Sequence, residues 1–157
     1  MRALVRLLIG ALLMSVSVLG TSAAHATAIG MEGCTPGYWK NHTDNWQETT
    51  PSTTFGTLYV DARANVAGIS LLAALQGGGG PGADGAATIL ARAATAAWLN
   101  AAHEGLGSPW RRYSTGLDGR PPLVPTVNAA FATGDRATML ALAMRLDTDN
   151  NLGCPLN

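Results

Sequence analysis

Apolar residues in this 157-residue chain recur at the spacing of α-helices. The clearest case is Met139, Leu142, Ala143 and Leu146, which repeat at i, i+3, i+4 and i+7 behind the N-cap residue Asp135. No stretch alternates between apolar and polar residues as a half-buried strand does. We therefore expect an all-α fold.

The same spacing predicts further helices, and Gly and Pro residues mark their ends. The predicted helices cover residues 35–46, 61–76, 84–103, 125–133 and 135–147. The connections between them are long, among them a glycine-rich run over 77–82 and an irregular segment over 105–122. Short helices with long connections favour a small irregular bundle over an up-and-down one.

Residues 1–26 are predicted to be a cleaved signal peptide. Arg2 and Arg6 precede an uncharged apolar run over 7–19, and Ala24-His25-Ala26 fits the small-residue pattern of a cleavage site. The apolar run is shorter than the roughly 20 residues that a membrane-spanning helix needs. We therefore expect the chain to be secreted, either extracellular or associated with the cell envelope.

Cleavage leaves 131 residues, which we divide into a linker over 27–33 and a single helical domain over 34–157. This mature chain has eight basic and ten acidic residues and no run of basic ones. Such a charge balance argues against nucleic acid as a partner. No later stretch is long and apolar enough to predict a membrane span in the mature chain.

The two cysteines of the chain, Cys34 and Cys154, lie near the ends of the mature part. In an oxidising compartment an isolated pair most simply forms one disulfide. In the chain-entropy model, closing a loop of this length contributes at most about 4–5 kcal/mol. We therefore expect the helical bundle to be closed by one disulfide.

The residues around Cys34 read Gly33-Cys34-Thr35-Pro36-Gly37-Tyr38-Trp39-Lys40-Asn41-His42, followed by Trp46. This segment resembles the motif C-T-P-G-[YF]-W-K-N-H, which begins the mature domain in an uncharacterised family of secreted bacterial proteins. Segments 71–81, 90–102, 127–135 and 146–155 look similar as well, so the resemblance covers nearly the whole mature chain. It implies a location outside the cell or on its surface, and it transfers no catalytic residues.

Two groups of side chains are candidate ligand-binding residues. They are the aromatic motif of Tyr38, Trp39, Lys40, Asn41, His42 and Trp46, and the group of Trp110, Arg111 and Arg112 with Tyr113. Flat aromatic faces can stack on sugar rings while the polar side chains bind hydroxyls, and Arg with aromatic residues often anchors interfaces. The alternative for the first group is a small core fixed by the disulfide. For the second group it is a solvated loop with one buried Trp.

Catalytic and metal-binding patterns are weak. His42, Asp44, His103 and Glu104 match neither H-x-x-x-H nor H-E-x-x-H, so we predict no metal ion, no cofactor and no catalytic residue. Residues 147–151 open like a calcium loop but lack its glycine and its final glutamate, and we interpret them as the end of a helix.

We thus predict a secreted or cell-surface, non-catalytic module with a binding or structural role. A cell-envelope polysaccharide or another surface protein is its expected partner. The alternative is a small extracellular hydrolase that uses His42 or His103 with Asp44 or Glu104, and it requires these side chains to converge in one open cleft. Nothing in the sequence indicates an oligomeric state.

Overall fold

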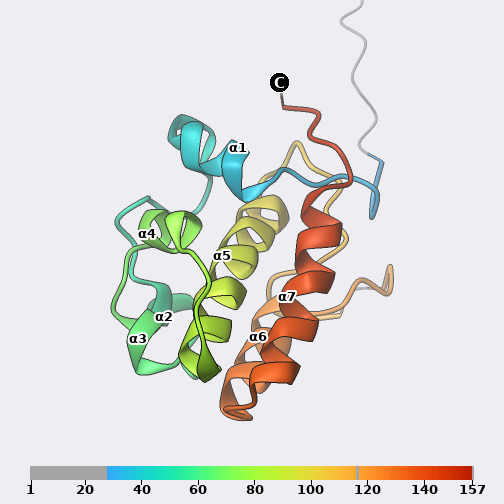
Figure 1. The fold of residues 1–157 in the computed structure, drawn as a ribbon. Coiled ribbons are helices and arrows are strands. Elements are labelled where there is room, and N and C mark those ends of the chain that lie inside the picture. Colours follow the sequence, from blue (N-terminus) through green and yellow to red (C-terminus); the bar gives the residue numbers. More distant parts are fainter. Residues whose placement is uncertain (1–27, 116, 157) are drawn as a thin grey trace, which may run out of the picture.

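The computed structural model describes residues 28–115 and 117–156, so the predicted signal peptide lies outside the described residues. Helices follow one another along these ranges (Figure 1), and the only β-structure within them consists of isolated bridges. The elements are α1 (Pro36–Asn41), the 3-10 turn η1 (Thr43–Asn45), α2 (Phe55–Leu58), α3 (Ala64–Ala67), α4 (Leu71–Gln76), α5 (Gly82–Ala102), α6 (Leu123–Ala132) and α7 (Arg136–Asn150). The predicted all-α fold is confirmed.

Helix α5 is the centre of the fold. Most of its residues are buried, and the majority of these are alanines, whose small side chains let neighbouring helices approach closely. Helix α7 packs along α5, and α1, α3, α4 and α6 contact it at other positions (Figure 1). In the part of the chain that the structure describes, none of the helices has both the length and the apolar composition needed to cross a bilayer.

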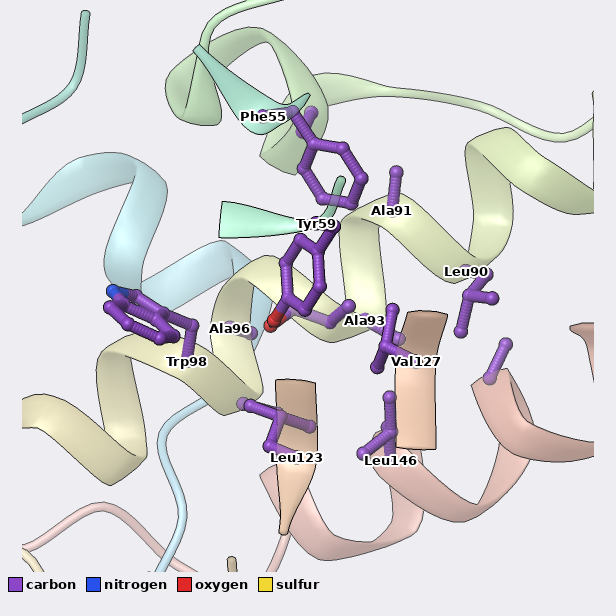
Figure 2. Packing of buried hydrophobic residues seen from close by; sticks show 14 of the residues in the cluster. Phe55, Tyr59, Leu90, Ala91, Ala93, Ala96, Trp98, Leu123, Val127 and Leu146 are labelled. Carbon is purple, nitrogen blue, oxygen red and sulfur yellow. The ribbon is translucent and has the colours of Figure 1, made fainter. Parts of the chain in front are cut away.

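The core between these helices combines aromatic and aliphatic side chains. Figure 2 shows Phe55 and Tyr59 in one cluster with Ala93 and Ala96 of α5, Leu123 of α6 and Leu146 of α7. The rings of Phe55 and Tyr59 lie 4.7 Å apart between centroids. The hydroxyl of Tyr59 donates to the carbonyl of Ala94 at 3.0 Å, which pairs a buried polar group inside an apolar core.

The predicted helix over 61–76 is broken in the structure into α3 and α4. The reason lies in the segment between them, whose backbone pairs with residues 53–55 instead of continuing the helix. Phe55 donates its N–H to the carbonyl of Ile69 at 2.8 Å, and Leu71 donates to that of Thr53 at 2.8 Å. Ser70 then caps α4 by accepting the N–H of Ala73. This pairing also positions α2, which lies in the connection between the helices predicted over 35–46 and 61–76.

The predicted helix over 35–46 is also too long. Helix α1 ends at Asn41 because His42 leaves helical geometry, and η1 follows. The predicted N-cap at Asp135 is confirmed, since its side chain accepts the N–H of Thr138, and Thr35 caps α1 in the same way by accepting that of Tyr38. Helix α7 runs to Asn150, three residues beyond the predicted end.

The predicted disulfide between Cys34 and Cys154 is confirmed, with the two Cα atoms 4.5 Å apart. Beside it, Gly33 donates its N–H to the carbonyl of Gly153 at 3.0 Å. A Cβ atom at position 33 would come within 2.1 Å of a backbone oxygen of α7, so only glycine fits this approach. The segment before the bridge lies against Gly107, which accepts the N–H of Gly30 at 2.7 Å.

Candidate functional site

The motif around Cys34 is held by the buried amide of Asn100, on α5. Its Oδ1 accepts the backbone N–H of Cys34 at 2.8 Å and the indole N–H of Trp39 at 2.9 Å. Its Nδ2 donates to the carbonyl of Cys34 at 3.0 Å and to Oδ1 of Asn150, on α7, at 2.8 Å. We call Cys34, Trp39, Asn100 and Asn150 the Asn100 cluster. It joins α1, α5 and α7 directly beside the disulfide.

The aromatic rings of the Cys34–His42 motif and of Trp46 pack within the fold. Trp39 is fully buried, and Tyr38 is 9 % exposed. The hydroxyl of Tyr38 donates to the carbonyl of Leu156 and accepts the side-chain N–H of Asn45 at 2.6 Å. Trp46 is half-buried, and its indole N–H donates to the carbonyl of Trp39 at 3.0 Å. The structural interpretation of these rings is therefore the one that the burial supports.

The polar residues of the motif, Lys40, Asn41 and His42, are exposed. The imidazole of His42 stacks on the ring of Tyr38 with 4.2 Å between centroids, and its Nδ1 lies 2.9 Å from the carbonyl of Tyr38. His42 is thus fixed at the end of α1 rather than directed into a cleft.

The two histidines and Glu104 of the hydrolase alternative have separate contacts, and Asp44 is exposed in η1. His103 packs beside the buried ring of Trp39, 5.9 Å between centroids, and burial lowers its pKa while Glu104 partly opposes the shift. Glu104 is exposed, and its backbone N–H donates to the side chain of Gln47 at 2.8 Å. Across the described ranges, no three His, Cys, Asp or Glu side chains are close enough to hold a metal ion together.

A polar hollow of about 210 Å³ lies between the end of α5 and the segment before α6. We call it the arginine hollow. It is lined by Ala101, Trp110, Arg111, Arg112, Tyr113, Ser114 and Arg120. It therefore brings together Trp110, Arg111 and Arg112 of the second predicted group, and it adds Arg120 and Ser114, which the sequence analysis missed.

Two carboxylates order the three guanidinium groups of this hollow. Asp118 accepts a two-pronged contact from Arg111, at 3.0 and 2.7 Å, and a further hydrogen bond from Nε of Arg120 at 2.9 Å. These bonds, that of Arg111 first, hold the pKa of the Asp118 carboxyl well below its usual range. Arg112 pairs with Glu48. Three positive and two negative groups leave the hollow with one surplus positive charge.

Trp110 is buried, which agrees with the alternative of a loop with one buried Trp. Its indole N–H donates to the carboxylate of Asp149 at 2.8 Å, and the guanidinium of Arg145 lies 4.6 Å from its ring centre. The exposed aromatic residue of the segment is Tyr113, at 60 %. Tyr113 meets the buried ring of Trp98 edge-on, and Arg112 covers the same ring at 5.6 Å.

Residues 147–151, which open like a calcium loop, form the last turn of α7 and its cap. The side chains of two of these residues already have other partners, since Asp149 binds Trp110 and Asn150 donates to the carbonyl of Ala93 at 3.0 Å. The interpretation of this segment as a helix end is confirmed.

No family of proteins, no curated protein and no solved structure matches this chain. The site therefore rests on geometry, and the likeness of the Cys34–His42 motif to secreted bacterial proteins stays an expectation.

Proposed function

We propose that the chain is a secreted, non-catalytic module that binds an acidic polysaccharide of the cell envelope through the arginine hollow. The observation that carries the proposal is the gathering of Arg111, Arg112 and Arg120 around one hollow with a surplus positive charge. Carboxylate groups of a polysaccharide pair well with guanidinium groups, because the planar fork matches the two oxygens.

The arginines keep donors for a ligand although carboxylates already hold them. A guanidinium has five N–H groups. Arg111 uses two of them on Asp118, and Arg120 uses one on Asp118 and one on the carbonyl of Ser108. The internal carboxylate thus fixes both side chains in place, so that a ligand meets donors that lose little conformational freedom.

Tyr113 and Ser114 supply the other contacts that a sugar needs. Tyr113 is the exposed aromatic ring beside the arginines, and a flat face of this kind can stack on a sugar ring. The hydroxyl of Ser114 can accept or donate a hydrogen bond to a sugar hydroxyl. The residue proposed to stack on a sugar ring is thus Tyr113, and not one of the tryptophans considered in the sequence analysis.

Export is part of the proposal. It is supported by the signal-peptide pattern of residues 1–26 and by a disulfide of the kind that persists in oxidising compartments. When the full chain is expressed in a secreting host, we expect the product in the medium to begin at Thr27. Intact-mass analysis measures this, and a product in the medium that keeps residues 1–26 contradicts the cleavage.

The binding test compares an oligogalacturonate with its neutral methyl ester by calorimetric titration of the secreted protein. We expect the acidic oligomer to bind, and the affinity to fall with added salt. The variants Arg112→Gln and Tyr113→Ala should each weaken binding about tenfold or more. Lys40→Gln removes the same charge from an exposed position of α1 and should change nothing.

Equal affinity for the acidic and neutral oligomers would refute the role of the arginines. Equal effects of Arg112→Gln and Lys40→Gln would refute the location of the site. Thermal unfolding of each variant shows whether it is folded, so that a loss of binding is not a loss of structure.

A further inference from the structure

A second hollow, of about 200 Å³, lies between α5, α7 and the glycine-rich connection that follows α4. We call it the α5–α7 groove. It is lined by Gly77, Gly79, Ile89, Arg92, Ala93, Ala143, Met144 and Asp147. Figure 1 shows the connection from α4 running back along α5. The groove shares no residue with the arginine hollow, so the two sites can be tested independently.

Opposite charges stand on the two helices of the groove. Arg92 is the one exposed residue between 86 and 100 on α5, and Asp147 is exposed on the facing helix α7. Among the described residues, neither side chain has an ion pair or a side-chain hydrogen bond. The groove therefore offers one unpaired cation and one unpaired anion, with no net charge that would favour a polyanion or a polycation.

The other side chains that line the groove are apolar. Ala93 and Ala143 are buried, and Ile89 and Met144 stand beside them, Met144 with 72 % of its surface exposed. An exposed methionine in a groove adapts to apolar groups of different shape.

The glycine-rich connection adds free backbone groups at the rim. Within the described residues, neither the N–H nor the carbonyl of Gly79 has a hydrogen-bond partner. The absence of a side chain also keeps this rim open, because a Cβ atom at position 79 would lie 2.9 Å from Cδ1 of Ile89.

We propose that the α5–α7 groove binds a short peptide with free termini and an apolar side chain, of dipeptide size. The terminal carboxylate pairs with Arg92, the terminal ammonium pairs with Asp147, and the apolar side chain lies on the alanine floor. The peptide group of the ligand exchanges hydrogen bonds with Gly79. In a free amino acid the ammonium and carboxylate groups are bonded to the same carbon, and there is no peptide group. It therefore lacks the hydrogen bonds to Gly79 and the spacing between the two charged groups that a dipeptide has.

Calorimetric titration of the secreted protein with Leu-Leu tests the proposal. We expect Leu-Leu to bind, and N-acetyl-Leu-Leu, Leu-Leu amide and Gly-Gly each to bind at least about tenfold more weakly. Free leucine should bind more weakly than Leu-Leu. No binding of Leu-Leu up to about 10 mM, or equal binding of the blocked peptides, overturns the proposal. Equal binding of leucine and Leu-Leu overturns the assignment to a peptide.

Charge-matched variants locate the site. Arg92→Gln and Asp147→Asn should each weaken binding of Leu-Leu about tenfold or more. Their controls, Lys40→Gln and Asp61→Asn, remove the same charges from exposed positions outside the groove and should leave the affinity unchanged. If the controls weaken binding as much as the groove variants do, the location is wrong.

Two neighbouring glycines give a steric test. Gly79→Ala places a methyl group against Ile89 and should weaken binding of Leu-Leu, whereas a Cβ atom at position 78 meets nothing within 4 Å. Gly78→Ala should therefore bind as the unaltered protein does. The opposite order, or equal affinities for the two variants, contradicts the proposed place of the ligand at this rim.

Discussion

Replacing Asn100 by leucine removes the amide that joins α1, α5 and α7 beside the disulfide. Asn100 is 1 % exposed, and all four of its hydrogen bonds are to buried groups. The substitution leaves four polar atoms without their partner. They are N and O of Cys34, Nε1 of Trp39 and Oδ1 of Asn150.

The expected cost follows from these four atoms. A buried polar group that loses its partner costs about 1–3 kcal/mol, so the simple sum is about 4–12 kcal/mol. Neighbouring groups do not add independently, and burying a leucine returns about 1.5–3 kcal/mol. Taking the middle of the sum, about 8 kcal/mol, we expect Asn100→Leu to lower the free energy of unfolding by about 3–6 kcal/mol, a large share of the roughly 5–15 kcal/mol of a typical domain.

Substitutions of two further asparagines give free energies of unfolding with which the effect of Asn100→Leu can be compared. Asn150→Leu leaves one N–H of Asn100 unpaired and removes the second donor to the carbonyl of Ala93, which lies within α5, so it should cost half as much or less. Asn128 lies on α6 and makes one exposed hydrogen bond, to the N–H of Asp61 at 3.3 Å, so Asn128→Leu should cost less than about 1 kcal/mol.

Urea unfolding followed by circular dichroism, with the disulfide intact, measures the three values. If Asn100→Leu fails to fold, the free energies of unfolding of the other two variants still test the reasoning, because Asn150→Leu should be less stable than Asn128→Leu. Values for Asn100→Leu and Asn150→Leu that lie within about 1 kcal/mol of Asn128→Leu would refute the reasoning.

The disulfide and the cap of α7 have separate expected effects. Replacing both Cys34 and Cys154 by alanine should lower the free energy of unfolding by about 2–5 kcal/mol in urea, and a loss below about 1 kcal/mol contradicts this estimate. Asp135→Ala should lower the thermal midpoint at pH 7, because the N–H of Thr138 loses its acceptor at 2.7 Å. That hydrogen bond lowers the pKa of Asp135 below its usual 3.8, so its stabilising effect is complete above that pH and disappears as the pH falls through the lower, folded-state pKa. The difference between variant and unaltered protein in thermal scans should therefore narrow on acidification, and a constant difference contradicts the assignment.

The long helices were predictable because their sequence pattern is local. The stripe of α7 and its cap at Asp135 lie within a few turns of each other, and the structure places them as expected. The break between α3 and α4 was not predictable in this way. It depends on the hydrogen bonds that Phe55 donates to Ile69 and Leu71 donates to Thr53, which helical spacing does not encode.

The candidate site also has some residues that the sequence pattern predicts and others that only the fold identifies. The sequence points to Arg111 and Arg112 as neighbours, but Arg120 joins them only through the shared carboxylate of Asp118. Asn100 stands on α5 in register with buried alanines, and a polar residue at such a position is itself a signal of a buried partner. The partners, Cys34 and Asn150, are 66 and 50 residues away, so only the fold identifies them.

The bond between Cys34 and Cys154 also determines how the module bears mechanical load. Tension applied to the segments on either side of the bridge passes through the sulfur atoms, and the helices between the two cysteines lie outside the path of the force. Such tension also loads the hydrogen bonds that tie the two flanking segments to the domain, those of Gly30, Gly33 and Leu156, while the bridge shields the core around α5. Once the bridge is reduced, the segment between the two cysteines, which are 120 positions apart in the sequence, becomes part of the extensible chain.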